Sequence, residues 1–158
     1  MDSIPTNGLY NPLPSEDRDR GVTELMWASA WGDLTAVEFL LDRGDDVNAR
    51  DRDGWTALHH ASLGGEHQDV MARLNAAGAD VNAKTGDGTF ALIMSAGYGK
   101  VEEVRTLLDN GADPNARDAG GRTALIAAEQ GGHSDEEREA IVQMLILAGA
   151  RRNDPGLS

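Results

Sequence analysis

The stretch that decides the fold reads GWTALHHAS at residues 54–62, and it is followed by GADVNA at residues 78–83. Three series built on these residues recur along the chain. The first glycine recurs with spacings of 33, 34 and 33 residues, at Gly21, Gly54, Gly88 and Gly121. A second glycine follows each of them by 11 residues, at Gly32, Gly65, Gly99 and Gly132. In the third series an asparagine lies four residues after a glycine, at Asn48, Asn82, Asn115 and Asn153. Three series that share one period indicate four tandem structural units.

Each unit is predicted to contain two helices. In each unit, a first run of apolar residues lies between the first and the second glycine. A second run, with apolar residues three and four apart, follows the second glycine and begins at Val37, Val70, Val104 and Ile141. Glycine ends each second helix because it adopts the left-handed conformation at little cost. We therefore expect eight main helices in four pairs and no sheet beyond short hairpin contacts. The expected core is Leu25, Leu40, Leu58, Leu74, Leu92, Leu107, Leu125 and Leu145.

These residues resemble the ankyrin repeat family, whose unit reads roughly G-x-T-P-L-H-x-A-A, then G-H, then V-x-x-L-L, and then G-A-D-x-N. The resemblance implies an all-α solenoid of four helix-turn-helix repeats with short hairpin tips. It covers an ankyrin-repeat domain at about residues 18–153, with repeats at about 18–50, 51–84, 85–117 and 118–153.

The chain departs from the family pattern at three positions. The proline of the motif is Glu24, Ala57, Ala91 or Ala124, the histidine survives only as His59, and Phe90 replaces a threonine. These departures concern local hydrogen bonds in the turns and leave the expected fold unchanged. The resemblance implies that His59 makes a turn-bridging hydrogen bond, and the adjacent His60 is expected to point away from it on a helix.

Both ends of such a stack must be capped, because one unit has too little apolar surface to fold alone. In the last unit, Gly132 and Gly149 lie 17 residues apart, and SDEE at residues 134–137 fits a capping box that starts a longer helix. Residues 1–17 carry Ile4, Leu9, Tyr10 and Leu13 among prolines. This segment is expected either to lie extended over the first unit or to form a mobile tail, and residues 154–158 form a C-terminal tail.

Composition and charge restrict the class of partner. The 158 residues include 27 acidic and 14 basic side chains, giving a formal net charge of −13. Such a surface repels phosphate backbones and anionic lipid and attracts basic surfaces. The chain has no cysteine, which excludes disulfides and suits a reducing cytoplasm, and it shows neither a secretion signal nor a long apolar run. We expect a cytoplasmic protein that is monomeric when free and binds neither nucleic acid nor membranes.

Catalytic chemistry is not predicted. The four histidines lack the spacing and the cysteine partners of a metal site, and no nucleophile elbow, phosphate loop or dinucleotide motif is present. Carboxylate pairs such as Glu102-Glu103 and Glu136-Glu137 are expected on solvent-facing helix surfaces. The sequence therefore predicts a protein that is not an enzyme and uses no metal or cofactor.

Candidate partner-binding residues are those that the repeat pattern leaves free to vary. The family resemblance implies contacts from the hairpin tips and from the ends of the first helices, which line a concave face. The candidates are Trp31, Trp55, Leu63, Tyr98, Arg52, Asp53, Asp87 and Arg122, and equivalent positions hold Arg20, Val22, Thr89 and Gln130. Trp, Tyr and Arg are enriched in binding hot spots. The alternative role for Trp31 and Trp55 is packing against the adjoining repeat.

Two functions fit these observations. The first is a small inhibitor, of the kind that acts as an immunity partner, which binds one basic protein through its concave face; small size and acidity favour it. The alternative is an adaptor or regulatory subunit that holds two proteins together, for which a single small domain offers less surface.

Overall fold

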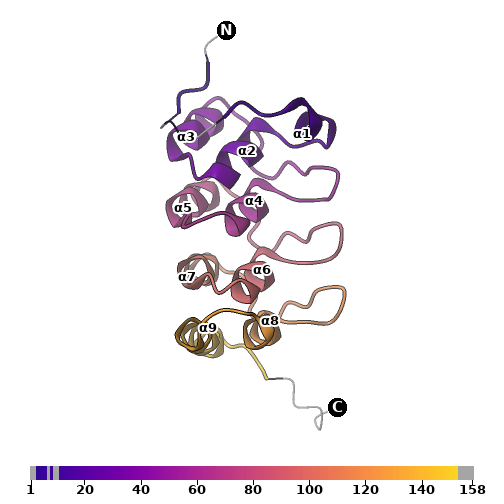
Figure 1. Ribbon diagram of the computed structural model, residues 1–158, viewed down its shortest axis with the longest axis vertical. Helices are drawn as coiled ribbons and strands as arrows, with labels where there is room; N and C mark the ends of the chain where they lie inside the picture. The colour runs from indigo at the N-terminus through magenta and orange to yellow at the C-terminus, as the bar shows by residue number, and fades with distance from the viewer. Residues whose placement is uncertain (1–2, 7, 9–10, 153–158) are drawn as a thin grey trace.

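The computed structural model describes residues 3–6, 8 and 11–152, and it is drawn as a ribbon in Figure 1. Within this part of the chain, a short helix precedes four helix pairs. The helices are α1 (Ser15–Asp19), α2 (Glu24–Trp31), α3 (Leu34–Asp42), α4 (Ala57–Leu63), α5 (Gln68–Ala76), α6 (Ala91–Gly97), α7 (Val101–Asp109), α8 (Ala124–Gln130) and α9 (Asp135–Leu147).

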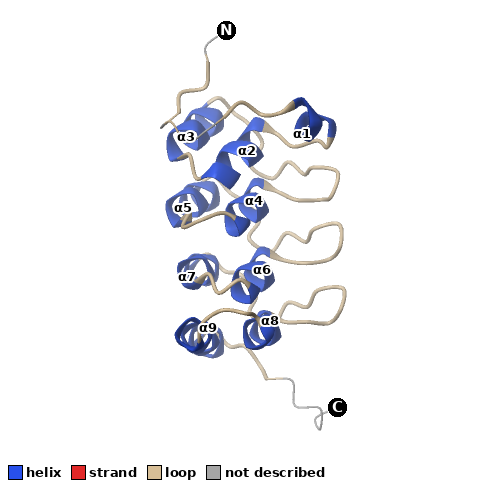
Figure 2. Cartoon of the chain, in the orientation of Figure 1, coloured by secondary structure: helices blue, strands red, loops and turns tan. Residues whose placement is uncertain are grey.

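The four pairs stack into two layers of helices. The first helices α2, α4, α6 and α8 contact one another in sequence, as do the second helices α3, α5, α7 and α9. Loops project from the first-helix layer along one edge of the stack (Figure 2). The β-pairing recorded among the described residues is a single antiparallel bridge between Lys84 and Phe90. These features confirm the predicted all-α ankyrin-type solenoid of four repeats.

One continuous apolar core runs through all four repeats. Each of the eight leucines predicted from the repeat register is buried in it. Small residues at the first-helix positions, including Ala28, Ala61, Ala96 and Ala128, are fully buried between the neighbouring helices. Because every repeat buries its apolar surface against its neighbours, the stability of the stack is shared between adjacent units.

The asparagine series forms a ladder that joins successive repeats. The Asn82 side-chain amide donates to the carbonyl of Gly111 at 3.1 Å, and its Oδ1 accepts from the backbone N–H of Asp113 at 2.8 Å. Asn48 bonds Gly78 and Asp80 in the same way, and Asn115 bonds Gly149 and Arg151. The third series of the sequence, that of the asparagines, therefore reflects hydrogen bonds between each repeat and the next. Asn153, which continues this series, lies outside the described residues.

The C-terminal end of the stack begins with the predicted capping box. The Ser134 hydroxyl accepts from the Glu137 backbone N–H at 3.2 Å, and the Glu137 carboxylate accepts from the Ser134 N–H at 2.9 Å. Hydrogen bonds from the Ser134 N–H and from the Ser134 hydroxyl to the carboxylate lower the pKa of the Glu137 carboxyl. Helix α9 then runs for 13 residues, compared with nine in α3, α5 and α7, as the longer spacing predicts.

The N-terminal end contains a helix that the sequence analysis did not predict. Residues Ser15–Asp19 form α1, which follows Pro14 and carries Glu16 and Asp17 in its first turn. Leu13 is buried, and Ile4 is partly buried against the core. Leu9, Tyr10 and the tail at 154–158 lie outside the described residues, so the predictions made for them stay predictions.

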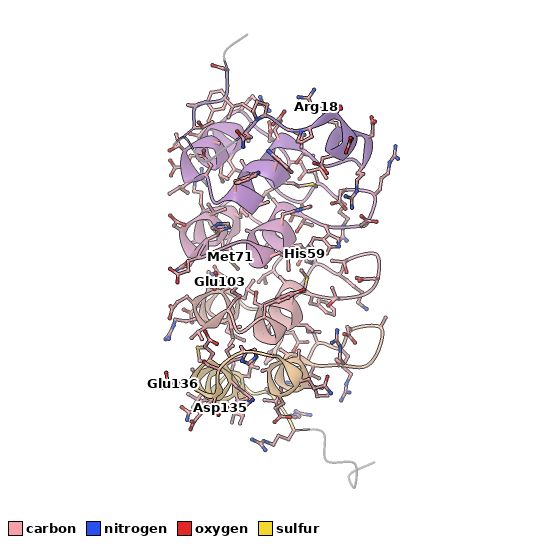
Figure 3. All side chains as sticks on the ribbon, viewed as in Figure 1. Arg18, His59, Met71, Glu103, Asp135 and Glu136 are labelled. Atoms are coloured by element: carbon pink, nitrogen blue, oxygen red, sulfur yellow. The ribbon has the colours of Figure 1, made fainter. Side chains whose placement is uncertain are left out.

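The prediction that Glu103 faces solvent was wrong. The sequence analysis placed this carboxylate on a solvent-facing surface, but its residue is only 2% exposed. Figure 3 shows Glu103 on the side of α7 that faces α5. Helix α7 packs against α5, α6 and α9, so its buried surface is wider than that of a helix packed on one side only. Glu102, Glu136 and Glu137 are exposed, as predicted.

Candidate functional site

Three equivalent hairpin tips project from the stack, at residues 51–55, 85–89 and 118–122. In each tip the first backbone N–H donates to the last carbonyl, at 3.0 Å in the tip of Asp51. The first side chain organises the turn: Asp51 Oδ1 accepts the N–H of Asp53 at 3.0 Å and that of Trp55 at 2.9 Å. Asp118 does the same with Gly120 and Arg122, and Thr85 uses its hydroxyl oxygen to accept from Thr89.

Neighbouring tips are held together by their backbones. Arg52 N–H donates to the Arg20 carbonyl at 3.0 Å, and Gly86 N–H donates to the Asp53 carbonyl at 2.7 Å. Gly54 has a φ of 76°, and a Cβ there would lie 2.6 Å from the Gly86 nitrogen. Only glycine suits this left-handed position and this close approach. The tips therefore present their side chains from a fixed backbone.

Tips and first helices together form a surface that we call the concave face. It consists of tip residues 20–22, 51–55, 86–89 and 122 and of the first-helix side chains that flank two hollows. The first, which we call the apolar hollow, has a volume of about 420 Å³ and is lined chiefly by Trp55, Leu63, Ile93, Met94, Tyr98, Ala127 and Gln130, with Asp87, Thr89 and Arg122 at the tips.

The second hollow, which we call the acidic hollow, has a volume of about 620 Å³. Its walls include three aromatic rings, four carboxylates, two guanidinium groups and two aliphatic side chains: Trp27, Trp55, His60, Asp17, Asp51, Asp53, Asp87, Arg20, Arg52, Val22 and Ala30. Trp55 and Asp87 line both hollows. The two hollows therefore adjoin along a groove that crosses several repeats.

The structure brings together most of the predicted partner-binding residues. Seven of them line the hollows: Trp55, Leu63, Tyr98, Arg52, Asp53, Asp87 and Arg122. Tyr98 is 65% exposed and Leu63 is 40% exposed, unusually open positions for large apolar side chains. Trp31 does not line either hollow; it is 42% exposed and packs edge-on against Trp27 at 5.9 Å between ring centroids.

Sequence reasoning missed one position that lines the groove in every repeat. Trp27, His60, Met94 and Ala127 occupy equivalent places in the four first helices, each four residues after the residue that precedes the helix. Trp27 and His60 line the acidic hollow, and Met94 and Ala127 line the apolar hollow. The available signal was the variation of this position, since a residue that only stabilised the repeat would be similar in all four units.

The two central histidines have structural partners. Thr56 N–H donates to His59 Nδ1 at 3.1 Å, so the proton on His59 Nε2 is donated to the Ala83 carbonyl at 3.0 Å. Burial lowers the pKa of His59 to about 4, which keeps the ring neutral. This contact confirms the turn-bridging role that the family resemblance implies. His60 points to a different partner and donates from Nε2 to Asp51 Oδ2 at 2.9 Å.

Ion pairs fix several charges of the concave face. Arg20 lies 3.2 Å from Asp53 of the next tip and 3.9 Å from Asp17. Arg122 pairs with Asp118 at 2.9 Å. Desolvation alone would raise the pKa of the Asp118 carboxyl, but hydrogen bonds from Arg122 and Gly120 outweigh it, so the pKa is lowered. Asp87 accepts a hydrogen bond from the Thr85 hydroxyl. Several charged side chains at the rim of the groove are therefore held in place by these contacts.

Neither a metal centre nor a membrane span occurs in the part of the chain that the structure describes. No three His, Asp or Glu side chains there gather closely enough to hold a metal ion. No described helix has the length and apolar character needed to cross a membrane.

A stack of helix pairs with a grooved face defines a helical-repeat solenoid, and comparison with known proteins identifies its family. A model described as ankyrin repeats (3 copies) matches residues 7–85, and one described as ankyrin repeats (many copies) matches residues 74–128. The chain therefore belongs to the ankyrin repeat family. Ankyrin repeats generally mediate protein–protein binding and are typically non-catalytic, and neither matching model describes a catalytic family.

Three relatives show the same region inside larger proteins. The chain is 33% identical over 144 residues to human BCL-6 corepressor-like protein 1, covering 90% of the chain and 8% of that protein. It is 35% identical over 146 residues to ankyrin repeat domain-containing protein SAT10 of Stachybotrys chartarum, covering 92% and 7%. It is 37% identical over 105 residues to potassium channel AKT3 of Oryza sativa subsp. japonica, covering 65% and 11%. The similarity thus concerns a small fraction of each relative.

Proposed function

We propose that this chain is a non-catalytic binding module that holds a basic protein against its concave face and acts as a stoichiometric inhibitor of that protein. The observation that carries the proposal is the gathering of Trp55, Leu63 and Tyr98 around two adjoining hollows. Large aromatic side chains at a grooved surface are the type of residue that dominates binding energy. In this proposal the free protein is a cytoplasmic monomer.

Charge supports a basic partner. The formal net charge of −13 produces a negative field around the whole domain, and such a field accelerates the encounter with a positively charged surface. The exposed carboxylates Asp53 and Asp87 lie at the tips, where an approaching protein meets them first. The same charge opposes binding to nucleic acid and to anionic membranes.

Site-specific photocrosslinking tests the choice of face. A benzophenone amino acid replaces Leu63 on the concave face, and in matched controls it replaces Glu38 on α3 or Glu139 on α9, both of which are exposed. We expect the Leu63 probe to crosslink one basic protein at a ratio of one to one, and the purified partner to lose its activity at that ratio. Crosslinking from the control positions alone would overturn the proposal for this face.

An adaptor function remains the second candidate, and one observation favours it. Among the described residues, the exposed large apolar side chains that do not line the hollows are Trp31 at the end of α2 and Ile146 and Leu147 at the end of α9, and Leu147 is 88% exposed. An adaptor needs such a second surface. A benzophenone probe at Ile146 that crosslinks a different protein while the concave face is occupied would establish the adaptor function in place of the inhibitor function.

A further inference from the structure

The groove differs in chemistry along its length. The apolar hollow, between the second and fourth repeats, has a floor of Ile93, Met94 and Ala127 with Leu63 and Tyr98 beside it, and the polar side chains of Asp87, Thr89, Arg122 and Gln130 complete its lining. Removing apolar surface from water is favourable and non-directional. This hollow therefore suits an aliphatic or aromatic side chain.

The acidic hollow suits a cation. Its four carboxylates outnumber its two guanidinium groups. Arg20 pairs with Asp53 and Asp17, Asp51 is largely buried and bonds His60, and Asp87 is exposed. Its walls also include the rings of Trp27, Trp55 and His60, and Trp55 lies 5.4 Å from His60 between centroids. A planar guanidinium can stack on an indole face while donating to carboxylates.

Trp55 and Asp87 join the two hollows. Both residues line both cavities, so a segment that fills one hollow passes directly into the other. The Asp87 carboxylate is exposed and accepts a hydrogen bond from Thr85, and this bond orients it at the boundary. The order of the hollows along the stack is fixed, with the acidic hollow on the side of α1 and the apolar hollow on the side of α8.

We propose that the groove binds a linear segment of the partner that carries an arginine and a neighbouring apolar side chain. The arginine enters the acidic hollow between Trp27 and Trp55, and the apolar side chain enters the hollow beside Leu63 and Tyr98. This inference rests on the proposed function of the concave face and adds the chemistry and the orientation of the segment that it recognises.

Nuclear magnetic resonance with blocked single amino acids tests this inference without the partner. The indole N–H signals of Trp27, Trp31 and Trp55 report the site, each assigned by a Trp→Phe variant. N-acetylarginine amide is expected to shift the Trp27 and Trp55 signals in a saturable manner and to shift Trp31 less, because Trp31 lies outside both hollows. N-acetylcitrulline amide, the neutral analogue, is the control. N-acetylleucine amide is expected to shift the methyl signals of Ile93 and Met94.

A variant separates the two hollows. Asp53→Asn, at a residue that lines only the acidic hollow, is expected to weaken the binding of the arginine probe by roughly 2- to 5-fold, the size of one exposed charge contact, and to leave the leucine probe unchanged. Equal shifts with citrulline and arginine, or no saturable shift at Trp27 and Trp55, would overturn the inference. The photocrosslinking result is independent: a partner that crosslinks at Leu63 while the arginine probe fails overturns only the recognised chemistry, and the reverse pattern overturns only the proposed function.

Discussion

Glu103 occupies a place that the other repeats fill with apolar side chains. Counting back eight residues from the glycine after each second helix gives Ala36, Val70, Glu103 and Ile141, and all four are buried. The Glu103 Oε1 atom has no hydrogen-bond partner among the described residues. Burying a carboxylate without a full set of partners is costly.

Replacing this carboxylate should therefore stabilise the protein. We expect Glu103→Val to raise the free energy of unfolding by about 1–3 kcal/mol, since the valine at Val70 shows that this side chain fits the equivalent place. Glu103→Gln, which keeps the shape without the charge, should give a smaller gain. Urea unfolding at pH 7 measures both variants, and a less stable Glu103→Val protein would show that the carboxylate has a stabilising partner.

His59 links stability to pH. Its pKa falls from 6.5 to about 4 on folding because burial penalises the charged ring, so the unfolded chain takes up the proton at higher pH than the folded protein. The contribution of the neutral His59 ring to the free energy of unfolding is fully present above pH 6.5 and is lost as the pH falls towards 4. The loss amounts to about 3 kcal/mol, from 1.36 kcal/mol for each pKa unit.

The comparison with His59→Gln isolates this effect. Glutamine does not titrate, so the difference in unfolding free energy between the two proteins should shrink as pH falls from 7 to 4. His67, whose pKa is also lowered by burial, is present in both proteins and cancels. Urea titrations at pH 7, 6, 5 and 4 provide the measurement, and a difference that stays constant with pH would contradict the assignment.

At the scale of single residues, the sequence predicted the positions that follow a recurring or local pattern and missed the positions that do not. The buried leucines, His59 and the capping box at Ser134 follow from recurring or local patterns, so their positions were predictable. Glu103 was missed because its residue type suggests exposure, although counting back from Gly111 places it with the buried residues Ala36, Val70 and Ile141. The groove position of Trp27 required knowing which side of α2 faces the tips.

At the scale of elements, the joint between repeats depends on the asparagine ladder. Each of Asn48, Asn82 and Asn115 connects its own repeat to two backbone groups of the next. These bonds hold successive loops at the same offset, and the tips of neighbouring repeats are then close enough for the bonds between Gly86 and Asp53 and between Arg52 and Arg20. The ladder thus sets the geometry of the groove.

Removing one rung should weaken the stack. Asn82→Ala loses the bonds to Gly111 and Asp113, and we expect it to lower the free energy of unfolding by about 1–2 kcal/mol. The matched control is Asn110→Ala, whose amide bonds only Thr106 in its own repeat. Equal losses for the two variants, measured by urea unfolding, would mean that the ladder adds nothing to the joint.

The sequence predicted the helices of the repeats but not the helix that precedes them. The eight helices of the four repeats followed from the period of the sequence, because each unit repeats the same apolar spacing and the same terminal glycine. Helix α1 did not, since Ser15–Asp19 has no buried residue and no repeat partner. Its first-turn acidic residues, Glu16 and Asp17, suit a helix N-terminus, but this local signal is weak without periodicity.

At the scale of the whole molecule, charge and shape have separate effects on binding. The net charge of −13 acts over distances set by the ionic strength, with a screening length of about 8–10 Å near physiological salt. Under the proposed function, we expect it to influence how quickly a basic partner arrives. Under the proposed function, the aromatic residues of the groove act only on contact, and we expect them to determine how long the partner stays.

Reversing the rim charges tests the first effect. Asp53→Lys and Asp87→Lys should slow the association of a basic partner severalfold at low salt and change its dissociation little. Added salt should reduce the difference from the unaltered protein. Stopped-flow association rates at several ionic strengths give the comparison, and a rate that ignores both the substitutions and the salt would exclude electrostatic steering by these tips.

The most direct test of the concave-face proposal is the dissociation rate of the complex with its isolated partner. Trp55→Ala and Tyr98→Ala should each weaken the complex by about 2 kcal/mol or more, almost entirely through faster dissociation. Exposed residues of the second-helix layer serve as controls, and Glu38→Ala and Glu139→Ala should leave the rate unchanged; Glu103 is unsuitable because it is buried. If Trp55→Ala and Tyr98→Ala leave the dissociation rate unchanged while Glu38→Ala and Glu139→Ala increase it, the result would contradict binding through the concave face.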